Sequence, residues 1–208
     1  DDKPQTGISF LLIDMKSPGV TVKPIRTMDG FEHVNEVWLE DVKVPAENLI
    51  GEEGMGFIYL MQNLPQERLS IAIMAAAAME SVLEETLQYV KERKAFGKPI
   101  GSFQNSRFLL AELATEATAV RVLTDEFIRL HLDEKLTADQ AAMAKWWTTE
   151  AQVKLIDRCV QLHGGYGYMR EYNVARAYLD ARVQTIYGGT TEVQLNIISK
   201  RILELPGA

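Results

Sequence analysis

Two short segments combine charged side chains in ways that could support chemistry. Leu64–Arg68 places a carboxylate and a guanidinium next to each other, at Glu67 and Arg68, and adjacent positions on a helix do not face each other. Arg93–Lys98 is a basic cluster beside an aromatic residue and a glycine, which could hold a phosphate or could end a helix. From spacing alone, solvated charges and a helix terminus are the simpler interpretation of these two segments.

Two further segments are rich in glycine. Gln161–Tyr168 has three glycines in four positions, which lets a backbone approach a ligand closely but is also common in an interhelical turn. In Tyr187–Gln194, Thr190 can cap a helix, and the free N–H groups of a helix N-terminus favour an anion. Spacing alone leaves both the ligand-binding and the structural interpretation open for each segment.

The elements that must position these segments change in kind at about Gly51. Before it, three runs predict strands from their β-branched residues and alternating pattern: residues 8–13, 20–23 and 34–44. Three strands are only marginally stable by themselves, so we expect them to be part of a larger sheet. The fold class predicted is mainly α, a C-terminal helical bundle preceded by a partial β-domain of about three strands. The predicted domains are residues 1–50 and 51–208.

After Gly51 the apolar pattern has the period of a helix. Residues 55–97 contain almost no breakers, and Pro65 predicts a kink or a break between two helices. A second helix follows residue 101, with a nearly heptad-spaced seam at Leu110, Leu113, Ala117, Val120 and Phe127. A third begins at the capping box Thr137–Gln140 and ends at about residue 162. Shorter helices are expected over residues 173–183 and 190–203.

Composition excludes several classes of protein. The 208 residues carry a formal net charge of −7 and are 47% hydrophobic and 25% charged, as in ordinary globular proteins. The acidic balance argues against nucleic acid or an anionic membrane as the main partner. The longest apolar run, Ile71–Met79, is too short to span a bilayer. A single cysteine, Cys159, forms no internal disulfide and favours a reducing compartment, and three dispersed histidines argue against a metal enzyme.

Taken in order, the four segments resemble the acyl-CoA dehydrogenase family, from Gly7 to about Leu203. The most specific matches are Arg93–Gly97, Gln161–Gly167 and Tyr187–Thr190, and Val42–Gly51 is similar to the family's exit from its β-domain. The family has an N-terminal helical domain, a middle β-domain and a C-terminal helical bundle. The resemblance implies that this chain, which begins at Asp1 without a Met, is a fragment holding the end of the second domain and all of the third.

The resemblance implies FAD as the cofactor. The position of Arg93 matches an arginine that reaches the FAD pyrophosphate, commonly that of a neighbouring subunit. The glycine turn matches the one that takes the adenosine and pyrophosphate end, and the last helix starts where the family's helix meets the flavin. The positions implied to contact FAD are Arg93, Phe96, Gln104, Gln161, Gly164, Gly165, Thr190 and Glu192.

One departure from the commonest family pattern concerns the catalytic base. Most members carry a glutamate where this sequence has Gly188, so no side chain at that position can take the substrate's α-proton. In the long-chain and isovaleryl types the base lies early in the bundle, just before an arginine that contacts the CoA end of the substrate. Here those positions are Glu67 and Arg68. The resemblance therefore implies Glu67 as the base, Arg68 and Gly188 as substrate-contacting positions, and a likeness to the long-chain type.

The function implied is FAD-dependent α,β-dehydrogenation of a long-chain fatty acyl-CoA. Implied partners are the acyl-CoA, electron-transfer flavoprotein and further copies of the chain, as a tetramer or dimer. The compartment implied is the bacterial cytoplasm or the mitochondrial matrix. Three alternatives stay open: an acyl-CoA oxidase that passes electrons to oxygen, a relative without a base that binds thioesters as a scaffold, and a plain helical interaction domain.

Overall fold

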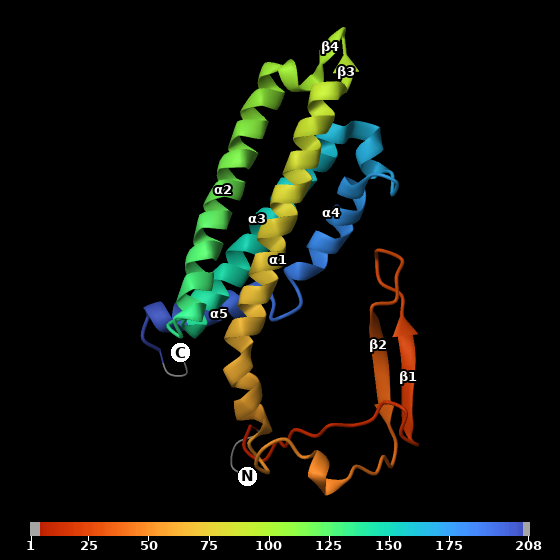
Figure 1. Cartoon of the computed structure of the whole chain (residues 1–208), viewed down its shortest axis with the longest axis vertical. Helices are drawn as coiled ribbons and strands as arrows, with labels where there is room; N and C mark the ends of the chain where they lie inside the picture. The colour runs from red at the N-terminus through yellow and green to blue at the C-terminus, as the bar shows by residue number, and fades with distance from the viewer. Residues whose placement is uncertain (1–4, 206–208) are drawn as a thin grey trace. The chain divides into compact units, whose positions relative to one another are not determined.

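The computed structural model describes residues 5–205, which fall into two compact units, the first ending at Leu64 and the second beginning at Pro65. The first unit carries the two longer strands, and the second carries most of the helices and a small hairpin (Figure 1). The predicted fold class, mainly α with a helical bundle after a short β region, is confirmed.

The first unit contains one two-stranded antiparallel sheet. β1 (Val20–Ile25) pairs with β2 (Val34–Leu39), and the ladder runs from the pair Val20–Leu39 to the pair Ile25–Val34. Apolar side chains of both strands are exposed, including Trp38 at 49%. An isolated hairpin is marginally stable in water, and this one leaves apolar side chains of both strands exposed.

Two segments expected to be strands have no strand ladder. Residues 8–13 form only isolated bridges, from Ile8 to Met55 and from Leu11 to Leu49. Met55 lies just before α1, and Leu49 lies just after the short 3₁₀ helix η1 (Ala46–Asn48). The N–H and C=O groups of the backbone around these two residues do not repeat at the spacing of a strand. Residues 42–44 are irregular as well, and they lead into Pro45, which cannot donate to a ladder.

The first long helix is continuous through Pro65, so the break that the sequence offered as one alternative is wrong. α1 (Gly56–Glu92) contains Pro65 in its interior. An interior proline removes one backbone donor and costs about 3 kcal/mol, but the rest of this 37-residue helix keeps its own ladder and its packing. The continuity matters for the site, because one helix carries residues 67 and 68 near one end and leads to residue 93 at the other.

Four more helices complete the bundle of the second unit. They are α2 (Gln104–Leu132), α3 (Ala138–His163), α4 (Asn173–Gln184) and α5 (Thr191–Ile202). Each overlaps the helix expected from sequence. A small hairpin, β3 (Lys94–Ala95) with β4 (Lys98–Pro99), and the 3₁₀ helix η2 (Ile100–Ser102) join α1 to α2. α3 contacts α2, α4 and α5, so it is the central helix (Figure 1).

The core confirms the heptad-spaced seam of α2. Leu113, Ala117, Val120 and Phe127 are buried, and Leu110 is half-buried beside the buried Leu109. They pack with α1 and α3 in two clusters that include Met79, Val82, Leu155, Ile156 and Cys159. Burial of this apolar stripe is what holds the long helices side by side.

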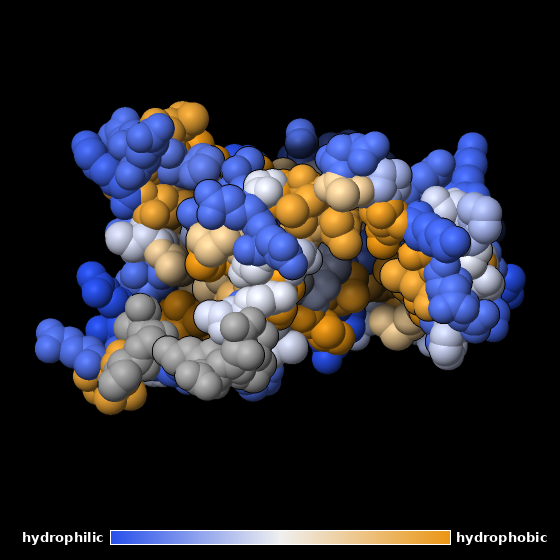
Figure 2. Space-filling view, turned by 90° about the horizontal axis from the view of Figure 1, so that it is seen from below, coloured by the Kyte–Doolittle hydropathy of each residue, from blue (hydrophilic) through white to orange (hydrophobic). Residues whose placement is uncertain are grey.

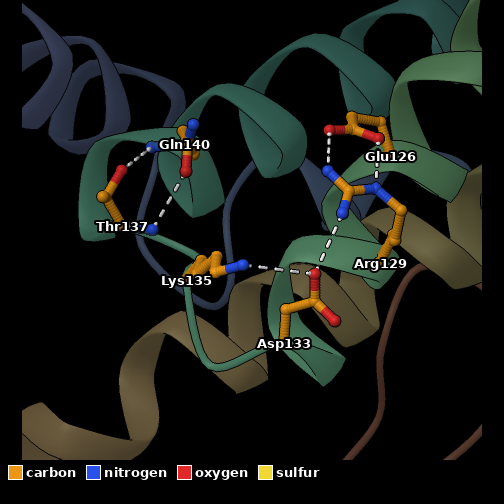
Figure 3. Close-up of polar contacts among 6 residues, drawn as sticks. All are labelled: Glu126, Arg129, Asp133, Lys135, Thr137 and Gln140. Atoms are coloured by element: carbon orange, nitrogen blue, oxygen red, sulfur yellow. Dashed lines mark hydrogen bonds and ion pairs between the residues drawn. The ribbon is translucent and has the colours of Figure 1, made fainter.

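The turn between α2 and α3 is fixed by polar contacts at both helix ends (Figure 3). Arg129 donates to Glu126 at 2.7 and 2.9 Å and to Asp133 at 2.9 Å. The predicted capping box is present: Thr137 N–H donates to Gln140 Oε1 at 3.0 Å, and Gln140 N–H donates to Thr137 Oγ1 at 3.4 Å. These bonds satisfy backbone donors that a helix start leaves free.

The surface is mixed. Apolar side chains interrupt the hydrophilic surface on the face drawn in Figure 2. Within residues 5–205, no helix has both the length and the apolar character that crossing a membrane requires. The same residues include no group of three or more His, Cys, Asp or Glu side chains arranged to hold a metal ion.

We predict that Thr137→Ala lowers the free energy of unfolding of the helical unit by about 1 kcal/mol, because it removes the cap of α3. Urea denaturation of the full-length protein measures the change. The matched control is Thr118→Ala, since that exposed hydroxyl bonds only to the Ala114 carbonyl within α2 and alanine favours a helix interior. Equal losses in the two variants would contradict a capping role.

Candidate functional site

Four of the predicted site residues lie together around a cavity of about 590 Å³. Arg93 reaches it from the end of α1, and Gln161, Gly164 and Gly165 reach it from the end of α3 and the 3₁₀ helix η3 that follows. These segments are far apart in sequence, and the bundle brings their ends together. We name these four residues the Arg93 cluster.

Arg93 is held in place by its backbone. Its N–H donates to the Tyr89 carbonyl at 2.8 Å, and its own carbonyl accepts from the N–H of Ile100 at 2.8 Å. The guanidinium carbon lies 5.3 Å from the centre of the Tyr166 ring, a cation–π distance. In the described part of the chain, Arg93 has no carboxylate in ion-pair range, so its charge is available to an anion.

The glycine turn leaves backbone open to the cavity. Gly164 ends α3 with φ +60° and ψ −137°, a conformation that an L residue rarely adopts. A Cβ built on Gly164 or on Gly165 would meet no protein atom within 4 Å. At Gly167, by contrast, a Cβ would overlap the Val160 carbonyl. Gly167 therefore serves packing, whereas the two earlier glycines border space that a ligand can fill.

Aromatic contacts support this turn. The Tyr89 ring stacks on the His163 imidazole with a centroid distance of 4.1 Å, and Tyr89 Oη donates to the His163 carbonyl at 3.2 Å. His163 Nδ1 lies 2.8 Å from the Cys159 carbonyl oxygen. The last turn of α3 is thereby tied to α1.

Phe96 and Gln104 do not line this cavity. Phe96 sits at the tip of the β3–β4 hairpin with φ +53° and is 95% exposed. Gln104 is the first residue of α2 and is also exposed. Both are free to contact something outside the chain.

A second group of predicted site residues lies around the loop between α4 and α5. Gly188 and Gly189 have φ values of +62° and +91°. A Cβ on Gly188 would overlap Ile71 Cδ1, so the loop packs directly against α1. Ile71 is four residues after Glu67, on the same helix face. We name Glu67, Arg68, the two glycines and the side chains that hold them the Gly188 cluster.

Two buried side chains hold the carbonyls of the glycine loop. Gln194 Nε2 donates to the carbonyls of Gly188 at 3.1 Å and Gly189 at 3.0 Å. Lys145 Nζ, from the centre of α3, donates to the Gly189 carbonyl at 2.8 Å. Lys145 and Gln194 are both 0% exposed.

Arg68 is also buried, at 7% exposed, whereas Glu67 is exposed. Arg68 Nε is buried with no hydrogen-bond partner within residues 5–205. Burial lowers the pKa of Arg68 below its ordinary value, and the Glu67 carboxylate opposes that shift. The structure thus places Arg68 inside the bundle, within interaction range of Lys145, rather than on its outer surface.

Thr190 and Glu192 form the start of α5. Thr190 is its N-cap, and Thr190 Oγ1 accepts from the N–H of Val193 at 3.4 Å. The pKa of Glu192 is lowered by its own backbone N–H, by the Thr190 hydroxyl and by Lys145. The predicted cap of the last helix is therefore confirmed, and it follows the glycine loop directly.

Sequence reasoning missed Lys145, Gln194 and Ile71. A signal for Lys145 was available, since it lies four residues after Ala141 and three before Thr148, on the stripe of α3 that is buried. A charged residue on an apolar stripe is uncommon unless it has a partner. The partner is a backbone carbonyl in a distant loop, which no local pattern reveals.

Comparison with known proteins agrees with this fold. Residues 54–203 match the family model described as acyl-CoA dehydrogenase, C-terminal domain. The chain is 46% identical over 202 residues to mouse long-chain specific acyl-CoA dehydrogenase, mitochondrial. The alignment covers 96% of this chain and 47% of the mouse protein.

Solved structures agree as well. A crystal structure of acyl-CoA dehydrogenase from Geobacillus kaustophilus superimposes with a TM-score of 0.94 at 44% identity, over 97% of this chain and 54% of that one. A glutaryl-CoA dehydrogenase from Mycobacterium smegmatis in complex with FADH2 gives a TM-score of 0.90 at 26% identity, over 96% of this chain and 52% of that one.

The range matched by the family model contains the helical bundle and the glycine loop packed on α1. This chain belongs to the acyl-CoA dehydrogenase family. It spans about half the length of the relatives described above.

We predict that Gly188→Ala destabilises the bundle by about 1–3 kcal/mol, since φ +62° strains an L residue and the methyl group meets Ile71 Cδ1. Ile71→Val removes that methyl and costs about 0.5–1.5 kcal/mol alone. The double variant should be more stable than the sum of the single losses, by about 1 kcal/mol. Additive losses in denaturant unfolding would show that residues 71 and 188 do not touch.

Proposed function

We propose that the full-length protein is an FAD-dependent dehydrogenase that introduces a double bond between the α and β carbons of a long-chain fatty acyl-CoA. The observation that carries the proposal is the contact of Gly188 with Ile71, one helical turn from Glu67. Position 188 has no side chain, a Cβ there would meet Ile71 Cδ1, and the carboxylate that could replace the missing one lies on the same face of α1. The likeness to the long-chain enzyme of mouse supports this substrate class.

The residues present fit a dinucleotide cofactor. An uncompensated guanidinium at Arg93 and open backbone at Gly164 and Gly165 suit a pyrophosphate. The capped start of α5, at Thr190 and Glu192, suits the flavin end. Bound FAD supplies an acceptor for a hydride, which no side chain can provide.

Glu67 has the simplest role among the chain's own residues. Its carboxylate takes the α-proton of the thioester and holds it on a carboxylate oxygen. The α-carbon becomes acidic enough only if the thioester oxygen is stabilised as it gains charge, and backbone N–H groups of the glycine loop suit that task. No hydrogen-bond acceptor within residues 5–205 is bound to the N–H of Gly188, Gly189 or Thr190. Arg68 adds positive charge beside the base.

The FAD site we propose is shared between two copies of the chain. Twenty-five residues of continuous helix separate Arg68 from Arg93, which corresponds to about 37 Å along the axis. This exceeds the reach of an extended FAD molecule, so the Gly188 cluster and the Arg93 cluster of one chain cannot hold the same cofactor. A closed dimer or tetramer pairs each cluster with the other from a neighbour, and exposed Phe96 and Gln104 then contact that shared cofactor.

The remaining assignments follow the family. We propose that residues 1–50 complete a β-domain whose other strands cover the exposed sheet, and that residues 51–208 are the helical bundle domain. We further propose electron-transfer flavoprotein as the oxidant of the reduced cofactor, and the bacterial cytoplasm or the mitochondrial matrix as the compartment.

We predict that Glu67→Gln in the full-length protein slows flavin reduction by acyl-CoA by about 10²–10⁴-fold, because general-base catalysis is lost. Stopped-flow absorbance of the flavin measures the rate, and the dissociation constant of a product enoyl-CoA should change little. Glu84→Gln, an exposed glutamate on another part of α1, is the matched control and should leave the rate intact. Wild-type rates in Glu67→Gln would refute the assignment, and a wild-type enzyme that binds acyl-CoA without flavin reduction would indicate a scaffold.

A rescue experiment sharpens this test. Adding Gly188→Glu to Glu67→Gln puts a carboxylate at the commoner family position, but Ile71 occupies that space. Recovery should therefore be small with Ile71 present and larger when Ile71→Val is added.

We predict that Arg93→Gln lowers the FAD content of the purified protein, because it removes the charge facing the pyrophosphate. The neighbouring Lys91→Gln, exposed at the end of α1, should keep its FAD. Absorbance at flavin wavelengths relative to protein gives the stoichiometry. Equal FAD content in the two variants would exclude Arg93 from the site.

Mixed oligomers test whether the site is shared. When subunits carrying Arg93→Gln and Glu67→Gln are mixed at random, roughly one quarter of shared sites combine an intact Arg93 with an intact Glu67. The mixture should then regain activity that neither variant has alone. If each chain built its own site, mixing would restore nothing.

A further inference from the structure

The Arg93 side chain meets an aromatic ring at the edge of the proposed cofactor cavity. The guanidinium carbon lies 5.3 Å from the centre of the Tyr166 ring, and both side chains line the cavity of about 590 Å³. Within residues 5–205 the guanidinium donates to no hydrogen-bond acceptor and pairs with no carboxylate. The Tyr166 ring is therefore the described contact that restrains its five N–H donors.

An aromatic partner leaves more of an arginine free than an acidic partner does. A ring attracts a cation through its quadrupole, and it neither neutralises the positive charge nor occupies the N–H groups. A carboxylate would do both, and it would compete with a phosphate for the same donors. Arg93 is thus held by a contact that keeps its charge and its donors available to a ligand.

The Tyr166 ring is itself held by aromatic neighbours. Its centre lies 5.1 Å from the centre of the Tyr172 ring, at the N-cap of α4. Tyr172 in turn meets the rings of Tyr89 and His163 edge-on, with centre distances of 6.4 and 6.3 Å, an arrangement that aromatic pairs favour. The ring that contacts Arg93 is therefore connected to α1, α3 and α4.

The turn after α3 places this ring beside the open backbone. Tyr166 lies within η3 (Gly164–Tyr168), and its carbonyl accepts from the N–H of Met169 at 3.2 Å. It is the first residue of η3 that has a side chain, and that side chain lines the cavity. Burial raises the pKa of Tyr89 above its ordinary value, and the charge of Arg93 opposes that shift. The guanidinium is thus within electrostatic range of one tyrosine and in contact with another.

We propose that Tyr166 is a positioning residue for Arg93 in the proposed FAD site. Its ring holds the guanidinium at the cavity before the cofactor binds, so less side-chain freedom is lost when the N–H groups meet the pyrophosphate. The proposal rests on the function given above, and it assigns a role to a residue that acts through Arg93.

The first test measures the dissociation constant of FAD for the full-length protein stripped of flavin, by quenching of flavin fluorescence. We expect Tyr166→Leu to raise this constant about twofold to fivefold, the size of an exposed cation–π contact. Tyr166→Phe keeps the ring and should bind FAD as the wild type does. Tyr168→Leu is the matched control, because Tyr168 lies in the same turn but is 93% exposed, and it should also bind normally.

Two results of this titration would overturn the proposal. One is an unchanged dissociation constant in Tyr166→Leu, and the other is an equal loss in the leucine and phenylalanine variants, which would show that the hydroxyl rather than the ring matters. Tyr166→Met also lacks the ring, and it decides the matter if Tyr166→Leu yields no folded protein.

A double-mutant cycle tests whether the ring acts through the guanidinium. In the Arg93→Gln background, Tyr166→Leu should change the dissociation constant of FAD less than it does in the wild-type background, since no guanidinium is left to position. Equal changes in the two backgrounds would show that the ring acts on the cofactor itself or on the fold, and would overturn the positioning role.

The outcomes separate this proposal from the function on which it rests. If wild-type protein binds no FAD, the proposed function fails and this proposal fails with it. If Arg93→Gln weakens FAD binding but Tyr166→Leu and Tyr166→Met do not, the function stands and the positioning role is overturned.

Discussion

The contact between Ile71 and Gly188 is the constraint on which the rest of the site depends. A Cβ at 188 would meet Ile71 Cδ1, so the loop before α5 lies directly against α1. The face of α1 that carries Ile71 also carries Glu67, so this helix can supply an acid–base group to the loop. Hydrogen bonds from Lys145 on α3 and Gln194 on α5 then hold the carbonyls of the loop.

The continuity of α1 determines how the site is divided. If Pro65 ended a helix, residues on its two sides would belong to separate elements and their spacing could change. Because the helix runs on from Gly56 to Glu92, Arg68 and Arg93 are held rigidly apart by many turns. The two clusters of one chain are therefore kept apart, which supports the proposal that two chains share the cofactor site.

Local sequence patterns predicted the features that depend on residues close together in the sequence. The caps at Thr137 and Thr190 and the apolar seam of α2 could be read from spacing because each depends on neighbours three to seven residues away. The strand predicted over residues 8–13 was wrong, because strand pairing depends on the geometry of partners that are distant in the sequence. The family resemblance indicated the candidate site residues. It did not predict that Arg68 is buried or that Lys145 donates to the Gly189 carbonyl, because both depend on residues far away in the sequence.

Two of the four buried side-chain atoms without a hydrogen-bond partner in the described residues belong to the Gly188 cluster, and the other two, Gln152 Oε1 and Gln184 Oε1, do not. Arg68 Nε and Gln194 Oε1 are both buried and unbonded in the described part of the chain, and Lys145 is a buried charge beside them. Each lowers stability relative to an apolar residue of the same size, and Lys145 and Gln194 both donate to carbonyls of the loop at Gly188 and Gly189. A helix selected only for packing would carry apolar residues at such positions, as α3 does at Ala141, Ala144 and Leu155. Buried polar groups that lower stability are expected where a residue type is kept for function rather than for packing.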